Sequence, residues 1–208
     1  MDNQLRSEVL ARASADSAAV GAFLAAADSY SRPQSDVPWP YSLLETLDGP
    51  EPVRRVLAVV HDNVKWLRGV LAERAWPGRS LVGEDGSDAF WLILQHAGSG
   101  VHTIGTPENL TFQAECIPLL EHAVQAGEAH PRHLAHIVDN QCARTSRSPE
   151  YAVLATAFQD GELKPDLDAE AVDANRARIG LLPVSVDLAR RRAGNPPDAT
   201  AGTRPEPW

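Results

Sequence analysis

One histidine near the end of a strongly apolar run is the first candidate for chemistry. Residues 87–97 carry large apolar groups on every side, and the polar groups close to their end are Gln95 and His96. A buried imidazole without a partner stays neutral, whereas a carboxylate beside it restores its basicity. The pattern is typical of a general acid or base, and equally of a core histidine that fastens one helix to another.

The carboxylate that we expect beside His96 is Asp139. It lies among apolar residues of residues 131–142 rather than in a solvated run. A His–Asp pair orients the imidazole for proton transfer, but it can also simply pin two helices together. Asp139 also follows His136 by three positions, so the alternative is a surface pair on one helix that contributes a few tenths of a kcal/mol.

A loop before the apolar run supplies the candidates for substrate binding. Residues 76–86 read Trp-Pro-Gly-Arg-Ser-Leu-Val-Gly-Glu-Asp-Gly, without the lysine of a Walker loop or the G-x-G-x-x-G spacing of a dinucleotide turn. Arg79 and backbone N–H groups at a helix start suit an anionic ligand, with Gln95 as a further polar contact and Ser80 as an outside candidate. The alternative is a structural loop in which Arg79 pairs with a local carboxylate.

Three histidines at intervals of three residues raise the question of a metal. His130, His133 and His136 are followed at the same interval by Asp139. Successive steps of three drift by about 60° around a helix, so neighbouring pairs could share a metal but all four could not readily do so. The chain has neither H-E-x-x-H nor a Cys-x-x-Cys pair. We therefore predict a solvated polar stripe, no metal site and no cofactor.

The composition of the chain indicates which partners it favours and in which cellular compartment it is expected. The 208 residues are 43% hydrophobic and 23% charged, with a formal net charge of −9. That charge disfavours nucleic acids and anionic membrane surfaces, and favours neutral or cationic small molecules and protein partners. Two cysteines, Cys116 and Cys142, cannot supply a disulfide framework, and no cleavable signal or membrane span is apparent. We expect a cytoplasmic protein.

The elements that must position these residues are mostly helical. The clearest periodic stripe predicts a helix over 51–75, with Pro52 in its first turn; its members are Val53, Val56, Leu57, Val60, Val64, Leu67 and Leu71. Residues 87–97 are predicted to form a central helix capped by Ser87, with a strand as the rival for 90–94.

Two further helices follow the central one. Thr106-Pro107 predicts the start of a helix over 107–126, whose predicted core stripe is Leu110, Ala114, Ile117, Leu120 and Val124. Pro131 opens the next helix, with Leu134, Ile137, Val138 and Gln141 on one face.

The two ends of the chain differ from this core. Residues 3–29 are rich in alanine and form one helix or two, and four prolines in 31–50 predict a connecting arm. After residue 150 the pattern weakens, and 151–158 is strand or loop. Residues 159–163 favour a small β-hairpin, and 168–180 and 183–192 favour short helices. Together these features predict a single mainly α-helical domain, divided into an extension and arm (1–50), a core (51–192) and a disordered tail (193–208).

The block from Trp76 to Ala97 resembles a widespread bacterial family that is classified only as domain of unknown function 6624. The likeness extends through 112–120 and less closely to Leu181, so it covers roughly residues 50–182. The resemblance implies a mostly helical fold and no known activity. The family usually has Asp after Gln-His-Ala and Arg after the later Asp, where this chain has Gly98 and Asn140. These departures imply a different ligand or a lost activity.

Two functions are consistent with these residues. In the first, the protein is a small-molecule enzyme in which His96 acts as acid or base, Asp139 orients it, and Gln95 with Arg79 positions a polar substrate for hydrolysis or proton transfer. In the second, the protein is a non-catalytic binding or interaction module in which the same residues hold the helices together. A His96–Asp139 pair in an open cavity would favour the first.

Overall fold

Long helices make up most of the chain in the computed structural model, which describes residues 1–27, 51–98 and 106–194. The chain divides into two compact units, Met1–Ala129 and His130–Trp208, referred to below as unit 1 and unit 2. The mainly α class with a small hairpin is confirmed. The predicted core of residues 51–192 spans the boundary between the units. The predicted arm, and the predicted tail from residue 195, lie outside the described residues.

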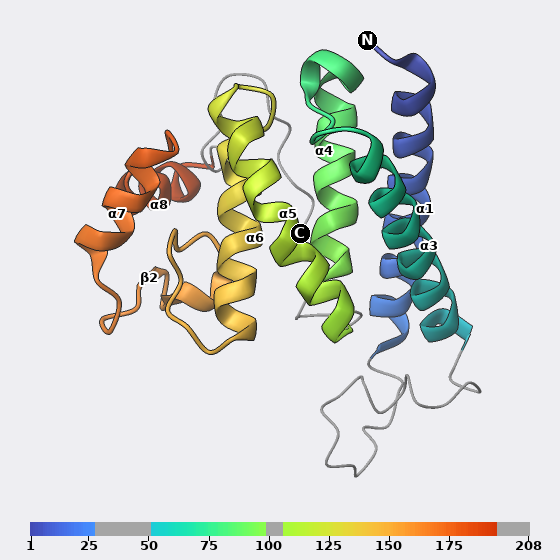
Figure 1. Cartoon of the computed structure of the whole chain (residues 1–208). Helices are drawn as coiled ribbons and strands as arrows, with labels where there is room; N and C mark the ends of the chain where they lie inside the picture. The colour runs from blue at the N-terminus through green and yellow to red at the C-terminus, as the bar shows by residue number, and fades with distance from the viewer. Residues whose placement is uncertain (28–50, 99–105, 195–208) are drawn as a thin grey trace. The chain divides into compact units, whose positions relative to one another are not determined.

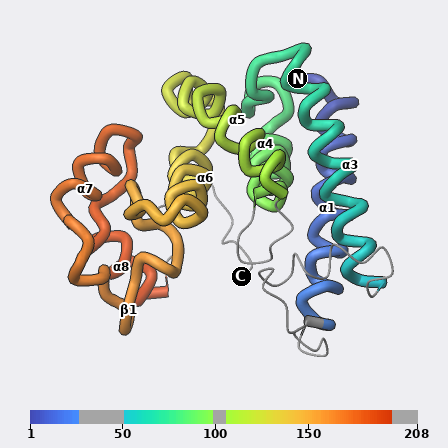
Figure 2. The backbone as a smooth tube through the Cα atoms, turned by 60° about the horizontal axis from the view of Figure 1, so that its bottom comes forward, coloured from blue at the N-terminus to red at the C-terminus, as the bar shows by residue number. Residues whose placement is uncertain are grey.

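Unit 1 contains four described helices: α1 (Asn3–Ala27), α3 (Glu51–Glu73), α4 (Arg79–Ala97) and α5 (Pro107–Gln125). Figures 1 and 2 show α1 and α3 lying side by side, and both pack against α4. The helix predicted over 51–75 is confirmed as α3, and five of its seven stripe residues are buried: Val53, Val56, Val60, Val64 and Leu67. The N-terminal region is a single helix.

Helix α1 is long and apolar enough to cross a membrane by length and composition alone, a test that the core helix of a folded protein and an N-terminal signal sequence also pass. In this structure it packs on α3 and α4. Five of its buried residues repeat at intervals of four and three, as in the seam between packed helices, and Ala19 beside them is buried as well; the five are Val9, Ala13, Asp16, Val20 and Phe23. One member of this apolar seam is therefore a carboxylate.

Helix α4 begins earlier than the sequence predicts. Its cap residue is Gly78 instead of Ser87, which is buried and donates its Oγ hydrogen to the carbonyl of Glu128 at 3.4 Å. Gly83 interrupts the helix with φ 79° and ψ 168°. This region of backbone conformation is essentially restricted to glycine. The segment predicted as a loop is thus a helical turn, a glycine kink and the continuation of the helix.

Helix α5 starts as predicted but buries a different face. Thr106 caps it by accepting a hydrogen bond from the Asn109 N–H at 3.2 Å. Of the predicted stripe only Leu120 is buried, and the buried set is Phe112, Gln113, Cys116, Leu120 and Ala123. Apolar residues occur on more than one side of this helix, so periodicity alone selected the wrong face.

Unit 2 contains α6 (Pro131–Arg144), a short 3₁₀ helix (Ala155–Ala157), strands β1 (Phe158–Gln159) and β2 (Glu162–Leu163), α7 (Ala169–Arg178) and α8 (Val184–Arg192). The predicted face of α6 is buried in full. The hairpin is confirmed, because β1 pairs with β2 in antiparallel fashion. Asp160 and Gly161 both have positive φ, which suits the tight turn between two strands.

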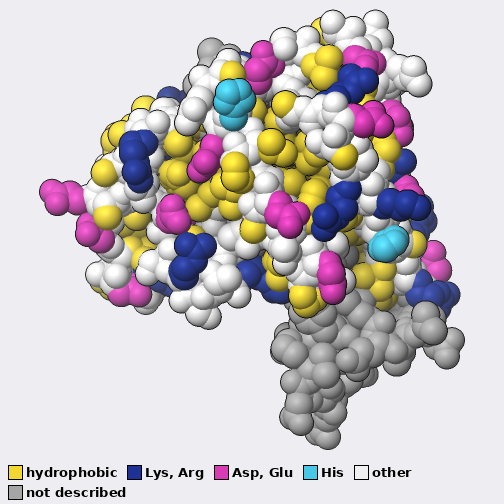
Figure 3. All heavy atoms as spheres, viewed as in Figure 1, with side chains coloured by type: hydrophobic (Ala, Val, Ile, Leu, Met, Phe, Trp, Pro, Cys, Tyr) yellow, Lys and Arg dark blue, Asp and Glu magenta, His cyan; other side chains and the backbone are white. Residues whose placement is uncertain are grey.

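A small apolar core holds the irregular part of unit 2. Its buried members are Ala152, Ala157, Val172 and Val184, against which Phe158, Leu163, Leu167 and Leu188 pack. On the surface shown in Figure 3, acidic and basic side chains of the described residues are interspersed rather than separated. The net negative charge is therefore not concentrated in a single patch on that face.

The glycine kink provides a first test. A methyl group on Gly83 would lie 3.0 Å from Asp85 Oδ1 and 3.3 Å from Arg6 Nε, in a backbone conformation that L-residues rarely adopt. We expect Gly83→Ala to lower the free energy of unfolding by about 1–3 kcal/mol, measured by urea denaturation.

Gly21 on α1 supplies the matched control. An added Cβ there meets nothing within 4 Å. Because alanine is the better helix former, Gly21→Ala should stabilise the protein by about 0.5–1 kcal/mol. Equal and small effects of the two substitutions would contradict the kinked geometry of α4.

Candidate functional site

The side chain of His96 contacts, within unit 1, a carboxylate that the sequence did not single out. Its Nδ1 contacts the Asp16 Oδ1 atom on α1, while Asp16 Oδ2 accepts a hydrogen bond from Asn63 Nδ2 on α3 at 3.0 Å. The Asp16 side chain is 1% exposed and that of His96 is 13% exposed. One buried carboxylate therefore joins α1, α3 and α4, and we call these three residues the His96 triad.

The chemistry of the carboxylate determines how the ring is protonated. An ionised carboxylate only accepts hydrogen bonds, so the ring nitrogen that faces Asp16 must carry a proton. In the neutral ring Nδ1 is then the N–H group, and Nε2 has the lone pair. This arrangement leaves Nε2 as the atom that exchanges a proton with another group.

The network continues from Asn63 to the surface of unit 1. The Asn63 side-chain oxygen accepts from Arg12 Nη1 at 3.2 Å, and this contact fixes which end of the amide faces Asp16. Arg12 also donates to Asp62 at 2.7 Å and lies over the Trp66 ring, 4.8 Å from its centroid. The orientation of the Asn63 amide is thus determined by contacts on both of its ends.

Asp139 belongs to unit 2 and has other partners. Its Oδ1 accepts from the N–H groups of Glu150 and Tyr151, both at 2.9 Å, and its Oδ2 accepts from the N–H of Val153 at 2.8 Å. Burial raises the pKa of Asp139, and these three backbone donors act in the opposite direction. The carboxylate that contacts His96 Nδ1 within unit 1 is that of Asp16, whereas the three donors to Asp139 belong to unit 2.

Arg79 and Ser80, the residues predicted to bind substrate, hold the start of α4 against the end of α5. Arg79 Nε donates to the carbonyl of Gly127, and the Ser80 backbone N–H donates to Glu128 Oε2 at 2.8 Å. The Arg79 backbone N–H donates to the Glu128 carbonyl at 2.9 Å. Arg79 and Ser80 thus have a structural role at this helix end.

Gln95, the fourth predicted site residue, directly precedes His96 in the sequence. Its side-chain Oε1 is buried and has no hydrogen-bond partner among the described residues. Its backbone carbonyl is contacted by Gln113 Nε2 at 3.4 Å, and the same nitrogen donates to the Leu94 carbonyl at 3.0 Å. Gln113 thus satisfies carbonyls at the end of α4, which holds the helix end that carries His96.

The three regularly spaced histidines of unit 2 have separate environments. His130 caps α6 by accepting from the Arg132 N–H at 3.0 Å. His133 is buried, and burial together with the positive charge of its neighbours His130, His136 and Arg132 holds its pKa well below the usual value. Within the described ranges of the chain, no group of three or more His, Cys, Asp or Glu side chains is arranged to hold a metal ion.

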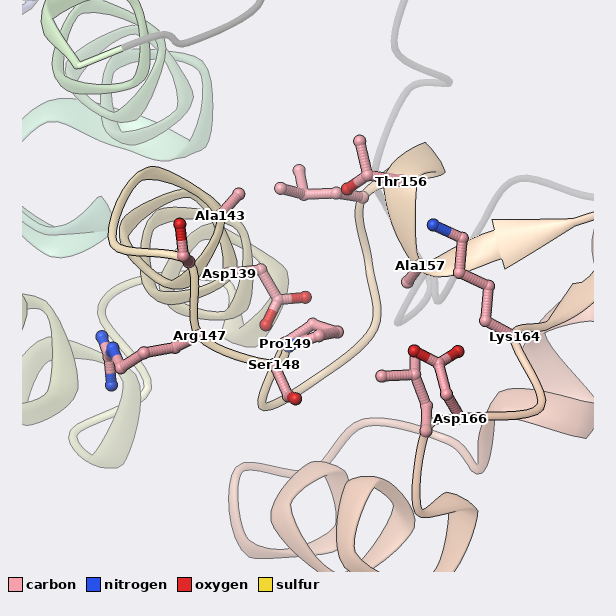
Figure 4. Close-up of a pocket in the computed structure, with 12 residues that line it drawn as sticks. Asp139, Ala143, Arg147, Ser148, Pro149, Thr156, Ala157, Lys164 and Asp166 are labelled. Carbon is pink, nitrogen blue, oxygen red and sulfur yellow. The ribbon is translucent and has the colours of Figure 1, made fainter.

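Each unit has a concave site that is lined by described residues. In unit 1 an open groove of about 510 Å³ runs between α1 and α3, with Asn63 and Arg12 in its lining. In unit 2 a cleft of about 410 Å³ is lined by the end of α6, the loop after it and the segments on either side of the hairpin (Figure 4). We call the second site the Lys164 cleft, after the lysine that lines it.

Reactive groups outside these sites include one acid with a shifted pKa. Burial and the charges of Glu84 and Asp85 raise the pKa of Asp88 to about 6, against the opposing effect of Arg79. Burial raises the pKa of the Cys116 thiol to about 12, which disfavours the thiolate form that reacts as a nucleophile.

Sequence reasoning missed Asp16 and Asn63, although both interrupt an apolar stripe. Asp16 occupies the core position between Ala13 and Val20, and Asn63 occupies the one between Val60 and Leu67. A polar residue in a packing seam requires a partner, since burying it alone is costly. That signal could have identified each residue as part of a network, although it does not reveal which distant residue completes it.

Comparison with protein-family models, curated proteins and solved structures finds no match to this chain. The resemblance to domain of unknown function 6624 therefore stays a prediction.

Asp139 provides a test of unit 2. An amide at this position presents an NH₂ group where the structure has an acceptor for backbone N–H donors. We expect Asp139→Asn to lower the free energy of unfolding by about 3 kcal/mol, because buried donors lose their acceptor. Asp166→Asn, at an exposed position, should change it by less than about 0.5 kcal/mol. Comparable stability of the two variants in urea would refute the assigned role of Asp139.

His133 should make unit 2 sensitive to acid. Its folded pKa is depressed, so the unfolded chain binds a proton more readily once the pH falls below the unfolded value of about 6.5. Stability attributable to His133 is present above that pH and is lost on acidification by up to about 1.4 kcal/mol per pH unit. His133→Gln should remove this slope between pH 6.5 and 5.

His122→Gln is the matched control, because His122 is exposed on α5. It should leave the acid slope of the wild type unchanged. Hydrogen exchange of the α6 amides, followed across the same pH range, assigns the effect to unit 2. An unchanged slope in His133→Gln would show that this imidazole is not buried in its neutral form.

Proposed function

We propose that the protein is a small-molecule enzyme that uses His96 as a general acid or base, with Asp16 as the residue that positions the ring. The observation that carries the proposal is the contact between the Asp16 carboxylate and His96 Nδ1. A carboxylate that orients an imidazole in this way is the recurring arrangement of proton-transfer sites.

The triad supports three parts of this role. Asp16 keeps the proton on Nδ1, so that Nε2 accepts a proton from a substrate or a water molecule. When the ring becomes an imidazolium, the negative charge of Asp16 offsets the new positive charge. Asn63 holds the second carboxylate oxygen at 3.0 Å, which prevents the acid from turning away from the ring. Hydrolysis or proton abstraction without a redox cofactor fits these groups.

Gln95 is the residue that we assign to substrate positioning. It precedes His96, and its buried side-chain oxygen has no hydrogen-bond partner among the described residues. A buried acceptor of this kind gains from a donor on a bound molecule. The proposed site therefore consists of His96, Asp16 and Gln95, with Asn63 as support.

A second function rests on the burial of the same network. Asp16 is 1% exposed and touches residues of two other helices, which is equally the structure of a polar clamp in a non-catalytic binding or interaction module. In that case the triad contributes stability and a unique helix arrangement rather than reactivity. Both functions are expected in the cytoplasm, with neutral or cationic partners favoured by the net charge of −9.

His96→Gln separates the two functions. For the enzyme, it should lower the turnover of a small activated ester such as p-nitrophenyl acetate by about 10²–10⁴-fold, the usual contribution of a general base. Asp16→Asn should lower kcat with little change in KM, because the amide favours the other ring tautomer.

His61→Gln is the control for background hydrolysis by surface imidazoles, since His61 is exposed on α3. It should retain the full rate. Undiminished turnover in His96→Gln, together with a lowered melting temperature, would remove the ring from catalysis and establish the polar clamp instead.

A further inference from the structure

The Lys164 cleft lies entirely within unit 2 and takes no part in the His96 triad. Its walls come from Asp139 and Ala143 of α6, from residues 146–149 and 154–157, and from residues 164–167. At about 410 Å³ it falls within the size range of small-molecule sites. Figure 4 shows polar groups on opposite walls, with Thr156 and Lys164 on one side and Ser148 on another.

The walls are held in place before any ligand arrives. Asp139 binds three backbone N–H groups of residues 150–153, and the Tyr151 carbonyl accepts from the fully buried Arg176 at 2.9 Å. The Lys164 backbone N–H donates to the Ala157 carbonyl at 3.0 Å, which ties two walls together. A cleft with walls fixed in this way loses little entropy when a ligand binds.

Lys164 supplies the positive charge of the cleft. Its side chain is half-buried, and Figure 4 shows its ammonium extended toward Thr156. In the part of the chain that the structure describes, Lys164 forms no ion pair. Arg147 points away in the same view and pairs with Glu150 at 3.5 Å. The lysine is thus the cation of the lining that is available to a ligand.

Two carboxylates, those of Asp139 and Asp166, also line the cleft, and they differ in how far they oppose the positive charge of Lys164. Both oxygens of Asp139 are already hydrogen-bonded to backbone donors. Asp166 is exposed at the rim, where its carboxylate suits a hydroxyl group of the ligand. The remaining lining combines the hydroxyls of Ser146, Ser148 and Thr156 with the apolar side chains of Leu154 and Leu167. This mixture fits a small anion with a hydroxylated body.

We propose that the Lys164 cleft binds a small hydroxylated organic anion, a phosphate monoester or a carboxylate, whose anionic group pairs with the Lys164 ammonium and accepts from Thr156. The protein as a whole carries a net charge of −9, so anions do not accumulate on it nonspecifically. Binding at this place therefore depends on the local lysine. The proposal does not depend on the activity of His96, which lies in the other unit.

Three probes with closely related hydroxylated bodies test the site: glucose 6-phosphate, gluconate and neutral glucose. Each is titrated into the full chain while the backbone amides of residues 146–148 and 154–157 are followed by NMR. At least one anion should produce saturable shifts confined to these residues and to residues 164–167, and glucose should not. Tighter binding of glucose 6-phosphate would identify a phosphate as the preferred anionic group, and tighter binding of gluconate would identify a carboxylate.

Lys164→Met is expected to weaken the binding of that anion at least tenfold, and Thr156→Val several-fold. Lys65→Met, which removes an exposed lysine of α3 in unit 1, controls for the change in net charge and should leave affinity unchanged. If Lys164→Met does not fold, the affinity of Thr156→Val for the same anion serves as the test. Failure of both anions to saturate, equal binding of glucose, or wild-type affinity in the deciding variant overturns the proposal.

Discussion

The buried carboxylate of Asp16 is the interaction on which the arrangement of unit 1 depends. A charge that is 1% exposed is stable only if donors surround it, because water has been removed from both of its oxygens. His96 and Asn63 provide those donors from two different helices. A shift of α3 or α4 along α1 would separate a donor from the charge, so the polar contact selects one packing arrangement among those that the apolar side chains allow.

Unit 2 uses the same principle with backbone rather than side-chain donors. Asp139 gathers three N–H groups of a segment that has little regular structure, and Arg176 binds carbonyls of Tyr151 and Leu182 from the other side. The residues between α6 and the hairpin are therefore ordered by charged side chains in place of a sheet or helix ladder. This segment and the end of α6 line part of the Lys164 cleft.

Features that depend on residues close together in the sequence were predicted, and features that depend on distant residues were not. The stripe of α3, the Thr106 cap of α5 and the Asp160-Gly161 turn depend on residues a few positions apart, and all three are confirmed. The partner of His96 was missed because Asp16 lies 80 positions away. Asp139 was expected to orient His96, and the backbone N–H groups that bind its carboxylate instead leave no trace in the sequence.

The contact between Asp16 and His96 determines which ring nitrogen of neutral His96 carries a proton, and this can be measured directly. A long-range ¹H–¹⁵N NMR spectrum of the imidazole rings at pH 8 reports which nitrogen of each neutral histidine carries hydrogen. Asp16 requires the Nδ1–H form for His96, and Asp16→Asn should abolish this preference while the other rings remain unchanged. An Nε2–H ring in the wild-type protein would contradict both the contact with Asp16 and the proton-transfer role derived from it.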